Sequence, residues 1–380
     1  MTTSLWIILV AIVIYMIMML TIGFKVADKN KTTSDFFLGG RSLGPLVTAM
    51  SAEASDMSGW LLMGLPAVAM MGGLAEASWT AIGLAIGTYI NWLIVAKRLR
   101  VYSQRIDAYT LPHFFGKRFG DDKKIITTVS AIFIIIFFIP YTASGFSACG
   151  KLFSSLFGMD YMLAMVISAA VIIIYCTLGG FLAASTTDFV QSIVMTIALF
   201  VVVGFGGFGN VFNNVSSLEG FTNLFKGHDV ANGVATSYGA LPVASTLAWG
   251  LGYFGMPHIL LRFMAIKDDN KLKISRRIAS VWVVISMAIA IFIGVIGVAF
   301  VKSHGLVESL GADFDAERII IYIADEFSKK NIVLAVIAGL IVSGIMASIM
   351  STADSQMLAA SSSMSENIIK RFFWKKMSNK

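Results

Sequence analysis

The sequence predicts an all-α integral membrane protein, a helical bundle that crosses the bilayer about nine times. Hydrophobic residues make up 57% of the 380 residues and charged residues only 13%, whereas about 25% of an ordinary globular domain is charged. Several apolar runs reach the roughly 20 residues with which an α-helix crosses about 30 Å of hydrocarbon. Lysine and arginine gather in only a few of the segments between these runs. These observations together indicate a polytopic membrane protein.

Nine apolar segments are long enough to be predicted as membrane spans. They lie at 4–24, 43–72, 74–96, 125–150, 160–178, 183–207, 239–262, 277–302 and 332–363. The first resembles a signal peptide in its position, but it lacks a preceding basic region and a clear small-residue cleavage site, so we predict a true span. Residues 303–331 are acidic and weakly amphipathic, which predicts a short surface helix.

The distribution of basic residues predicts the orientation of the chain. The segments after spans one, three, seven and nine hold 23 of the 29 Lys and Arg residues. Because basic loops stay in the cytoplasm, the N-terminus is predicted outside and the C-terminus of this chain inside. The net charge of +7 then reflects topology and requires no nucleic-acid partner.

The sequence offers no pattern of an enzyme or of a metalloprotein. Cys149 and Cys176 are interpreted as small packing residues, and the four histidines are scattered without the spacing of metal ligands. No Gly-rich loop followed by Lys and Ser or Thr is present, so the chain shows no means of using ATP. We therefore predict neither catalysis nor an organic cofactor.

A polar run interrupts the second predicted span. Residues 51–60 hold Glu53, Asp56, Gly59 and three serines, and carboxylates at membrane depth are costly unless they face water, protein or an ion. Small polar residues followed by glycine and a nearby proline also allow a helix to unwind, which frees backbone carbonyls for a cation. We predict that the chain unwinds near Ala54–Met57.

A second interruption lies in the seventh span, which runs in the opposite direction. Residues 247–258 contain three glycines and Pro257. Two interrupted spans in corresponding, inverted positions indicate a transporter substrate site; the alternative, that the glycines only permit close packing, stays open. Trp249 and Tyr253 lie one helical turn apart beside this interruption, where they either bind substrate or fill space.

The ninth span supplies hydroxyl groups. Four of them recur at steps of three and four residues and therefore share one helical face: Ser348, Ser351, Thr352 and Ser355. Hydroxyl and carbonyl oxygens without several carboxylates suit a monovalent cation better than a divalent one. Hydrogen bonding between helices is the alternative interpretation.

The acidic residues within or near the spans receive different predictions. Asp56 is predicted to support a bound cation electrostatically, or to cap the helix half that begins at Met57. Glu53 is interpreted as structural or as part of a gate, and Glu76 as solvated near the external mouth. Asp188 is predicted to pair with a loop arginine or to line the inner exit, and the role of Asp354 stays open.

Several segments resemble one family of transporters. They are 36–44 (FFLGGRSLG), 51–66, 91–100 (NWLIVAKRLR), 252–258 (GYFGMPH) and 262–266 (RFMAI). On these segments the chain resembles the sodium/solute symporters, and within that family the bacterial sodium/proline symporters. The resemblance covers essentially the whole chain. It implies sodium-coupled import of L-proline by alternating access, with Na⁺ as the coupling ion.

The resemblance also implies the fold, a leucine-transporter-like inverted-repeat bundle within a single transmembrane domain, 1–380. Residues 4–24 would form an extra N-terminal helix, 43–207 the first five-helix repeat, 239–363 a partial second repeat and 364–380 a cytoplasmic tail. Members of the family continue further, so we expect the last core helices to be missing here.

The family's site residues carry over position by position. The implied sodium ligands are the backbone carbonyls of Ala54, Met57 and Ser348 and the hydroxyls of Ser351 and Thr352. Asp56 would support the site electrostatically. The implied substrate-binding residues are Ser58, Gly59, Trp60, Tyr141, Trp249, Tyr253 and Pro257. Glu53, Ser348 and Thr186 depart from the family pattern, because smaller residues are frequent at the first two positions and an aromatic residue at the third.

Alternatives to proline import remain. The solute could be another amino acid, pantothenate, a sugar or an organic acid, or the module could act as a sensor. For every symporter interpretation we expect a monomer in the bacterial cytoplasmic membrane, with the lipid bilayer and a small-molecule substrate as its partners.

Overall fold

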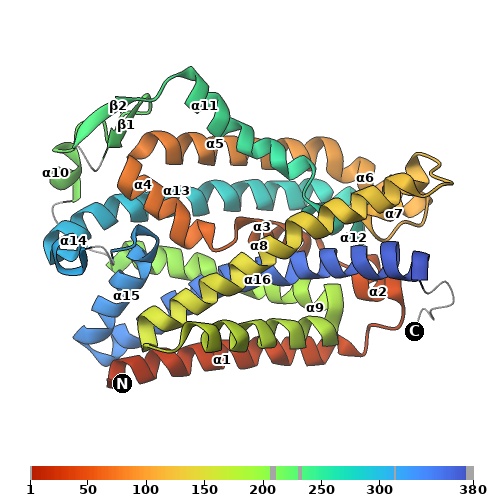
Figure 1. The fold of residues 1–380 in the computed structure, drawn as a ribbon, viewed down its shortest axis with the longest axis horizontal. Helices are drawn as coiled ribbons and strands as arrows, with labels where there is room; N and C mark the ends of the chain where they lie inside the picture. The colour runs from red at the N-terminus through yellow and green to blue at the C-terminus, as the bar shows by residue number, and fades with distance from the viewer. Residues whose placement is uncertain (1, 206–210, 230–232, 312–313, 374–380) are drawn as a thin grey trace.

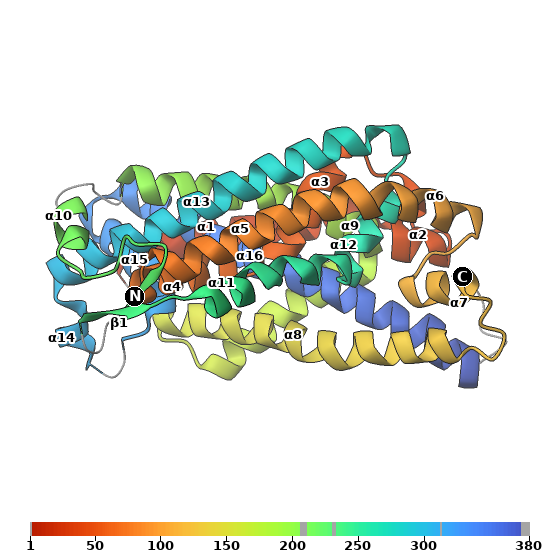
Figure 2. The ribbon, with the colours of Figure 1, turned by 90° about the horizontal axis from the view of Figure 1, so that it is seen from above.

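The computed structural model describes residues 2–205, 211–229, 233–311 and 314–373, which form a bundle of long helices lying roughly side by side (Figure 1). A small hairpin and several short helices lie at one end, together with the start of α1 (Thr3–Ala27). The other end holds α2 (Thr33–Leu38), α6 (Lys97–Arg105) and α7 (Leu111–Arg118) (Figures 1 and 2). We call these the hairpin end and the basic end.

Six helical stretches within the described ranges are long and apolar enough to cross a membrane. They are built on α1, α5 (Leu74–Asn91), α8 (Ile125–Phe157), α9 (Tyr161–Phe205), α13 (Leu272–His304) and α16 (Ile332–Met364). The π-helical turn η3 (Trp92–Ala96) and α6 extend α5 toward the basic end. These six stretches account for seven of the predicted spans: one, three, four, five, six, eight and nine. The numbers differ because α9 contains both span five and span six.

The two halves of α9 fold back on each other at Gly180 (Figure 1). This residue has φ +55° and ψ −149°, and a Cβ atom there would lie 2.7 Å from the Phe36 carbonyl oxygen. Only glycine adopts such a conformation readily and also tolerates this close approach. The predicted boundary between spans five and six is therefore confirmed.

The remaining two predicted spans are each divided into shorter helices. Span two consists of α3 (Pro45–Met57), the π-helical η2 (Trp60–Gly64) and α4 (Leu65–Gly72). Span seven consists of α11 (Ala240–Leu247), the 3₁₀-helix η4 (Ala248–Phe254) and α12 (Pro257–Ala265). All nine predicted spans thus have helical counterparts in the described part of the chain.

Short elements complete the two ends. The hairpin end carries α10 (Val211–Ser216), the antiparallel strands β1 (Lys226–Asp229) and β2 (Val234–Ser237), α14 (Leu306–Leu310), η7 (Ala316–Arg318) and α15 (Ile319–Lys330). The basic end carries η1 (Gly39–Arg41) and η5 (Asp269–Lys271). The surface helix predicted within 303–331 is α15, which buries Ile319, Ile320, Ile323 and Phe327. The hairpin was not predicted from the sequence.

The predicted tail at 364–380 differs from the expectation in its first part. Residues Ser365–Phe373 form the π-helical η8, which continues α16, and residues 374–380 lie outside the described ranges. Glu366 of η8 accepts a hydrogen bond of 2.8 Å from the Tyr109 hydroxyl. This contact holds the end of α16 against the segment before α7.

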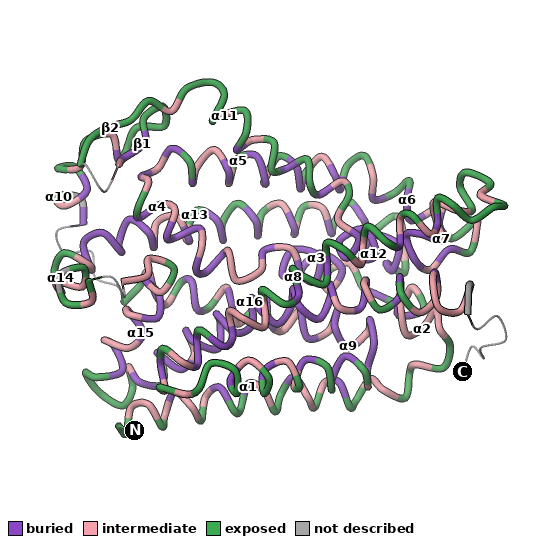
Figure 3. Tube along the Cα trace, in the orientation of Figure 1, coloured by how far each residue is buried: buried purple, intermediate pink, exposed green. Residues whose placement is uncertain are grey.

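The distribution of burial fits a bundle in lipid. The central helix α16 is buried along most of its length, whereas α1 alternates between buried and exposed residues (Figure 3). The exposed side of α1 is apolar and includes Ile14, which is 62% exposed, and Phe24, which is 60% exposed. Phe133 and Phe137 of α8 are exposed in the same way. Continuous apolar surface of this kind suits hydrocarbon rather than water.

At the basic end, the two divided spans are joined through main-chain atoms. Leu43, two residues before α3, forms a parallel bridge with Ile266 after α12: its N–H donates to the Ala265 carbonyl at 3.2 Å, and its carbonyl accepts from the Lys267 N–H at 2.9 Å. Arg41 donates a hydrogen bond of 2.6 Å to the Met264 carbonyl, and Arg100 one of 2.6 Å to the Ile266 carbonyl. Three of the segments singled out by sequence, around 41, 100 and 264, therefore meet in one place.

Candidate functional site

The second span is broken immediately after α3. Ser58 has φ +51° and ψ −173°, a conformation that ends the helix, and Gly59 leads into η2. The prediction that the chain unwinds at Ala54–Met57 is therefore wrong in position, because α3 stays helical through Met57. The physical consequence is nonetheless similar, since the last four carbonyls of a helix have no partner within it.

Oxygen atoms from two helices meet at this helix end. The Ser351 hydroxyl of α16 lies 2.8 Å from the Ala54 carbonyl oxygen and 3.2 Å from the Ser348 carbonyl oxygen. The Thr352 hydroxyl lies 3.4 Å from the same Ser348 oxygen. Four of the five predicted sodium ligands are thus close together, and they form a set of uncharged oxygens of the kind that suits a monovalent cation.

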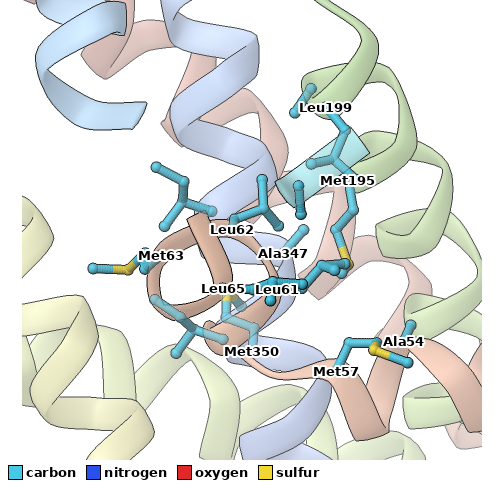
Figure 4. Close-up of a cluster of buried hydrophobic side chains, with 14 of the residues drawn as sticks. Ala54, Met57, Leu61, Leu62, Met63, Leu65, Met195, Leu199, Ala347 and Met350 are labelled. Carbon is cyan, nitrogen blue, oxygen red and sulfur yellow. The ribbon is translucent and has the colours of Figure 1, made fainter. Parts of the chain in front are cut away.

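The side chains around this set are apolar. Ala54 and Met57 of α3, Leu61 of η2 and Met350 of α16 lie in one buried cluster (Figure 4). The contact is tight, because a Cβ atom on Gly59 would lie 3.0 Å from the Ile349 side chain. These buried, apolar neighbours strengthen electrostatic interactions at the oxygen set, since they lower the local dielectric constant.

The seventh span is broken where the sequence predicts. After η4, Gly255 is followed by Met256 in an extended conformation, and Pro257 begins α12. Gly250 has a different role: a Cβ atom there would lie 2.1 Å from the Gly83 carbonyl oxygen. The packing interpretation therefore holds for this glycine, whereas Gly255 lies at the break itself.

Between the two breaks lies a cavity of about 170 Å³, which we call the aromatic cavity. Trp60 and Trp249 contact each other at its wall, with ring centroids 5.6 Å apart and ring planes tilted by 36°. Its lining consists of Asp56, Met57, Ser58, Trp60, Leu84, Tyr141, Trp249, Gly252, Tyr253 and Met256. Five of the predicted substrate-binding residues line it, but Gly59 and Pro257 do not. Three lining residues were not predicted: Leu84, Gly252 and Met256. Glycine and apolar side chains inside a span carry no chemical signal in a sequence.

A second cavity of about 310 Å³ adjoins the first and shares Ser58, Trp60 and Tyr141 with it. We call it the vestibule. Gly59 and Thr352 line it, together with serines of α8, and it reaches Lys151 and Glu317 near the hairpin end. The vestibule therefore connects the breaks to the end of the bundle that is poor in basic residues.

The structure places two of the acidic residues in protein contacts. Glu53 is 3% exposed and accepts a hydrogen bond of 3.0 Å from the Trp92 indole nitrogen. Asp56 lines the aromatic cavity, where the Tyr253 hydroxyl lies close enough to interact with its carboxylate. Glu76 is exposed on the first turn of α5.

A buried ionic network lies on the basic side of the oxygen set. Arg262 of α12 pairs with Asp188 of α9 at 2.9 Å, and their side chains are 1% and 0% exposed. Arg262 also donates to Ser51 at 3.0 Å and to Ser355, whose hydroxyl donates to Asp354 at 2.8 Å. The partner of Asp188 is thus an arginine within a half-helix, not in a loop, because the break at 255–256 turns α12 into the bundle.

The Asp354 carboxylate has a second donor, the Tyr175 hydroxyl at 2.7 Å. The network therefore joins α3, α9, α12 and α16, and so includes the halves of both broken spans that lie toward the basic end. No group of three or more His, Cys, Asp and Glu side chains suited to a metal ion occurs among the described residues. The oxygen set beside α16 is the place in the site that best fits an alkali cation.

These features define a class of protein. Two broken helices that run in opposite directions through a membrane bundle and enclose a shared cavity are the hallmark of transporters built from inverted repeats. The assignment is to a transporter and not to an enzyme.

Comparison with known proteins identifies the family. Residues 36–380 match the model of the sodium:solute symporter family, so the chain belongs to this family. It is 42% identical over 380 residues to the osmoregulated proline transporter OpuE of Bacillus subtilis, covering 98% of this chain and 73% of that protein. It is equally similar to the sodium/proline symporter of Escherichia coli, at 42% identity over 98% of this chain and 72% of that protein.

A solved structure has the same fold. The substrate-bound outward-open state of a Na⁺-coupled sialic acid symporter superposes with a TM-score of 0.79 at 18% identity, covering 98% of this chain and 76% of that one. The predicted fold class is thereby confirmed. The chain is a multi-pass membrane transporter.

Proposed function

We propose that this protein is a sodium-coupled symporter that imports L-proline across the bacterial cytoplasmic membrane by alternating access. The observation that carries the proposal is the meeting of uncharged oxygens from α3 and α16 directly beside the aromatic cavity. The names of relatives at 42% identity, which are proline transporters, support the choice of solute.

The sodium ion would bind at the end of α3. Its ligands would be the carbonyl oxygens of Ala54, Met57 and Ser348 and the hydroxyls of Ser351 and Thr352. Asp56 would supply a negative charge nearby. In the structure the Ser351 hydroxyl donates to the Ala54 carbonyl. An ion at this point would turn the hydroxyl lone pairs inward and replace that hydrogen bond, so binding would tighten the junction of α3 and α16.

The substrate would lie in the aromatic cavity. A pyrrolidine ring packs well on indole and phenol rings, here those of Trp60, Trp249 and Tyr253. Ser58, Gly59 and Tyr141 would contact it from the side of the vestibule. Pro257 would act indirectly, because it begins α12 and thereby sets the shape of the second break.

Coupling follows from this proximity. Sodium and proline would each raise the other's affinity by the same factor, since both favour the same arrangement of the two breaks. Residues 43–207 and 239–363 would form the two repeats within one domain, and one bundle of helices drawn from both repeats would rock against the other. The excess of basic residues at the basic end supports a cytoplasmic position for that end and an external N-terminus.

Uptake by the purified chain in liposomes tests the proposal. Labelled proline is expected to accumulate under an inward sodium gradient and not under an equal potassium gradient. Asp56→Ala should abolish most of this uptake, and Ser351→Ala should raise the sodium concentration for half-maximal uptake by about 10- to 100-fold, the effect of losing one contact to a charged group.

Competition and a control variant separate the alternatives. Excess unlabelled amino acids, pantothenate, sugars and organic acids are tested against labelled proline; competition by one of them at lower concentration than proline would reassign the solute. Ser361→Ala, in the last turns of α16 and distant from the oxygen set, should leave the sodium dependence unchanged. Unchanged sodium dependence in both Asp56→Ala and Ser351→Ala would refute the site.

A further inference from the structure

A buried amide faces the vestibule without a hydrogen bond. Gln356 of α16 is fully buried and lines this cavity, and neither its Oε1 nor its Nε2 has a hydrogen-bond partner among the described residues. The Tyr141 hydroxyl lies close enough to interact, but no bond of ordinary geometry joins the two groups. A buried polar group without a partner destabilises the folded protein and calls for an explanation.

Other buried amides in the bundle behave differently. The Asn91 side chain donates to the Tyr253 carbonyl at 2.9 Å, and the Gln191 side chain donates to the Tyr15 hydroxyl at 3.0 Å. Each of these amides joins two helices, which is the usual structural use of such groups in membranes. Gln356 forms no such bond of ordinary geometry to a neighbouring helix, so a structural role of this kind does not account for it.

The position of Gln356 suggests what it does bind. It lies one helical turn after Thr352, a residue of the oxygen set that also lines the vestibule. The vestibule shares Ser58, Trp60 and Tyr141 with the aromatic cavity, so a molecule whose ring fills the aromatic cavity can extend its other end to α16. The amide has both donors and an acceptor, which match the carboxylate and the ammonium group of a zwitterion.

We propose that Gln356 is a substrate-positioning residue that hydrogen-bonds the charged end of the zwitterionic substrate, while the aromatic cavity holds the apolar part. The inference rests on the proposed function and adds the means by which the site selects an α-amino or α-imino acid over an uncharged solute. A sodium ligand would need only the amide oxygen, whereas the zwitterion satisfies both ends of the side chain.

The mouth of the vestibule has a matching charge pattern. Lys151 and Glu317 line it with opposite charges, both side chains are exposed, and no ion pair joins either of them to another described residue. Two unpaired charges of opposite sign present a dipolar field to an approaching zwitterion. This arrangement supports the same substrate class.

Equilibrium binding of labelled L-proline to the purified chain in saturating sodium tests the proposal. Gln356→Leu, which keeps the size and removes the polar atoms, should raise the dissociation constant for proline by about 10- to 100-fold. Binding of prolinamide, which lacks the carboxylate, should change much less, so the preference of the wild type for proline over prolinamide should largely disappear. Sodium-induced protection against heat should stay within about twofold of the wild type in its half-effective concentration.

The matched control is Gln191→Leu, the same substitution at a buried amide away from both cavities. It should lower thermal stability and leave the proline and prolinamide affinities unchanged. Gln356→Glu serves if the leucine variant does not fold, because it keeps the shape and places a carboxylate against the substrate carboxylate, which should weaken proline more than prolinamide.

The outcomes distinguish the two proposals. A wild type that binds no proline refutes the proposed function, and the inference falls with it. A wild type that binds proline, together with variants of Gln356 that keep its affinity and its preference over prolinamide, refutes the inference alone. Equal loss of proline and prolinamide binding also refutes it, because such a loss reports a change of cavity shape.

Discussion

Replacing Arg262 by methionine should strongly destabilise the bundle. The guanidinium is 1% exposed and lies 2.9 Å from the Asp188 carboxylate, which is 0% exposed. Its loss would leave the fully buried Asp188 carboxylate with the Ser51 hydroxyl, which donates to it at 2.6 Å, and without a compensating charge. Removing one partner of a buried ion pair typically costs about 3–5 kcal/mol, because the other charge stays buried and unpaired.

The assay is the fraction of monodisperse protein that survives heating in detergent. A loss of about 3–5 kcal/mol corresponds to a decrease of roughly 10 °C in the midpoint, taking about 2–4 °C per kcal/mol for chains of a few hundred residues. The double variant Arg262→Met with Asp188→Asn should recover much of this loss, since the neutral amide removes the stranded charge.

The matched control is an exposed pair of the same type. Lys329 contacts Asp325 at 2.8 Å one turn apart on α15, with side chains 59% and 39% exposed. Lys329→Met should cost no more than about 0.5 kcal/mol, because exposed pairs of this spacing contribute little. An Arg262→Met protein as stable as the Lys329→Met protein, or a double variant no better than the single one, would refute the electrostatic account of the network.

Two further predictions concern contacts between the broken helices and their neighbours. Trp92→Phe keeps an aromatic ring but removes the donor to Glu53, so we expect a loss of about 1–3 kcal/mol in the same heating assay and a partial recovery when Glu53→Gln is added. Gly87→Val should prevent folding, because a Cβ atom at Gly87 would lie 2.3 Å from the Gly250 carbonyl oxygen; folded yield is measured by size-exclusion chromatography.

Controls for both are available in the chain. Gly204→Ala adds a Cβ atom where nothing lies within 4 Å, so its yield should match the wild type. If Gly87→Val folds as well as Gly204→Ala, α5 and η4 do not pack as tightly as the structure indicates. If Trp92→Phe costs nothing, the Glu53 carboxyl is satisfied by another group.

The fold was largely predictable because lipid imposes a strong rule on sequence. Every backbone group in hydrocarbon must be paired within its own helix, so spans appear as long apolar runs that a reader can count. The reversal of the chain at Gly180 was predictable for the same reason, as the boundary between spans five and six. The β1–β2 hairpin was missed because its strands, Lys226–Asp229 and Val234–Ser237, belong to none of the long apolar runs, so this rule does not apply to them and no alternating pattern replaces it.

The candidate site was predictable where chemistry is unusual for its surroundings. Glu53, Asp56 and the hydroxyls of α16 stand out within apolar spans, and the structure brings most of them together. The error in the position of the first break has a local cause: residues 45–57 satisfy helix geometry up to Met57, and the conformation of Ser58 ends the helix. A sequence shows that a helix is weak but not at which residue the tertiary contacts break it.

Other site features depend on contacts between distant residues. The pairing of Asp188 with Arg262 requires α12 to turn inward after the second break, and the isolation of the Gln356 amide depends on the shape of a cavity between α8 and α16. Neither property belongs to a local segment. For that reason no spacing rule could have produced them.

The main-chain bridge between Leu43 and Ile266 has a consequence for motion. The bridge joins the segment before α3 to the segment after α12, and Arg41 and Arg100 donate hydrogen bonds to carbonyls of that second segment. Neither half-helix can therefore move away from the other without breaking these bonds. A passage at the basic end would therefore form when α3 and α12 tilt together, as one rigid unit, away from α9 and α16.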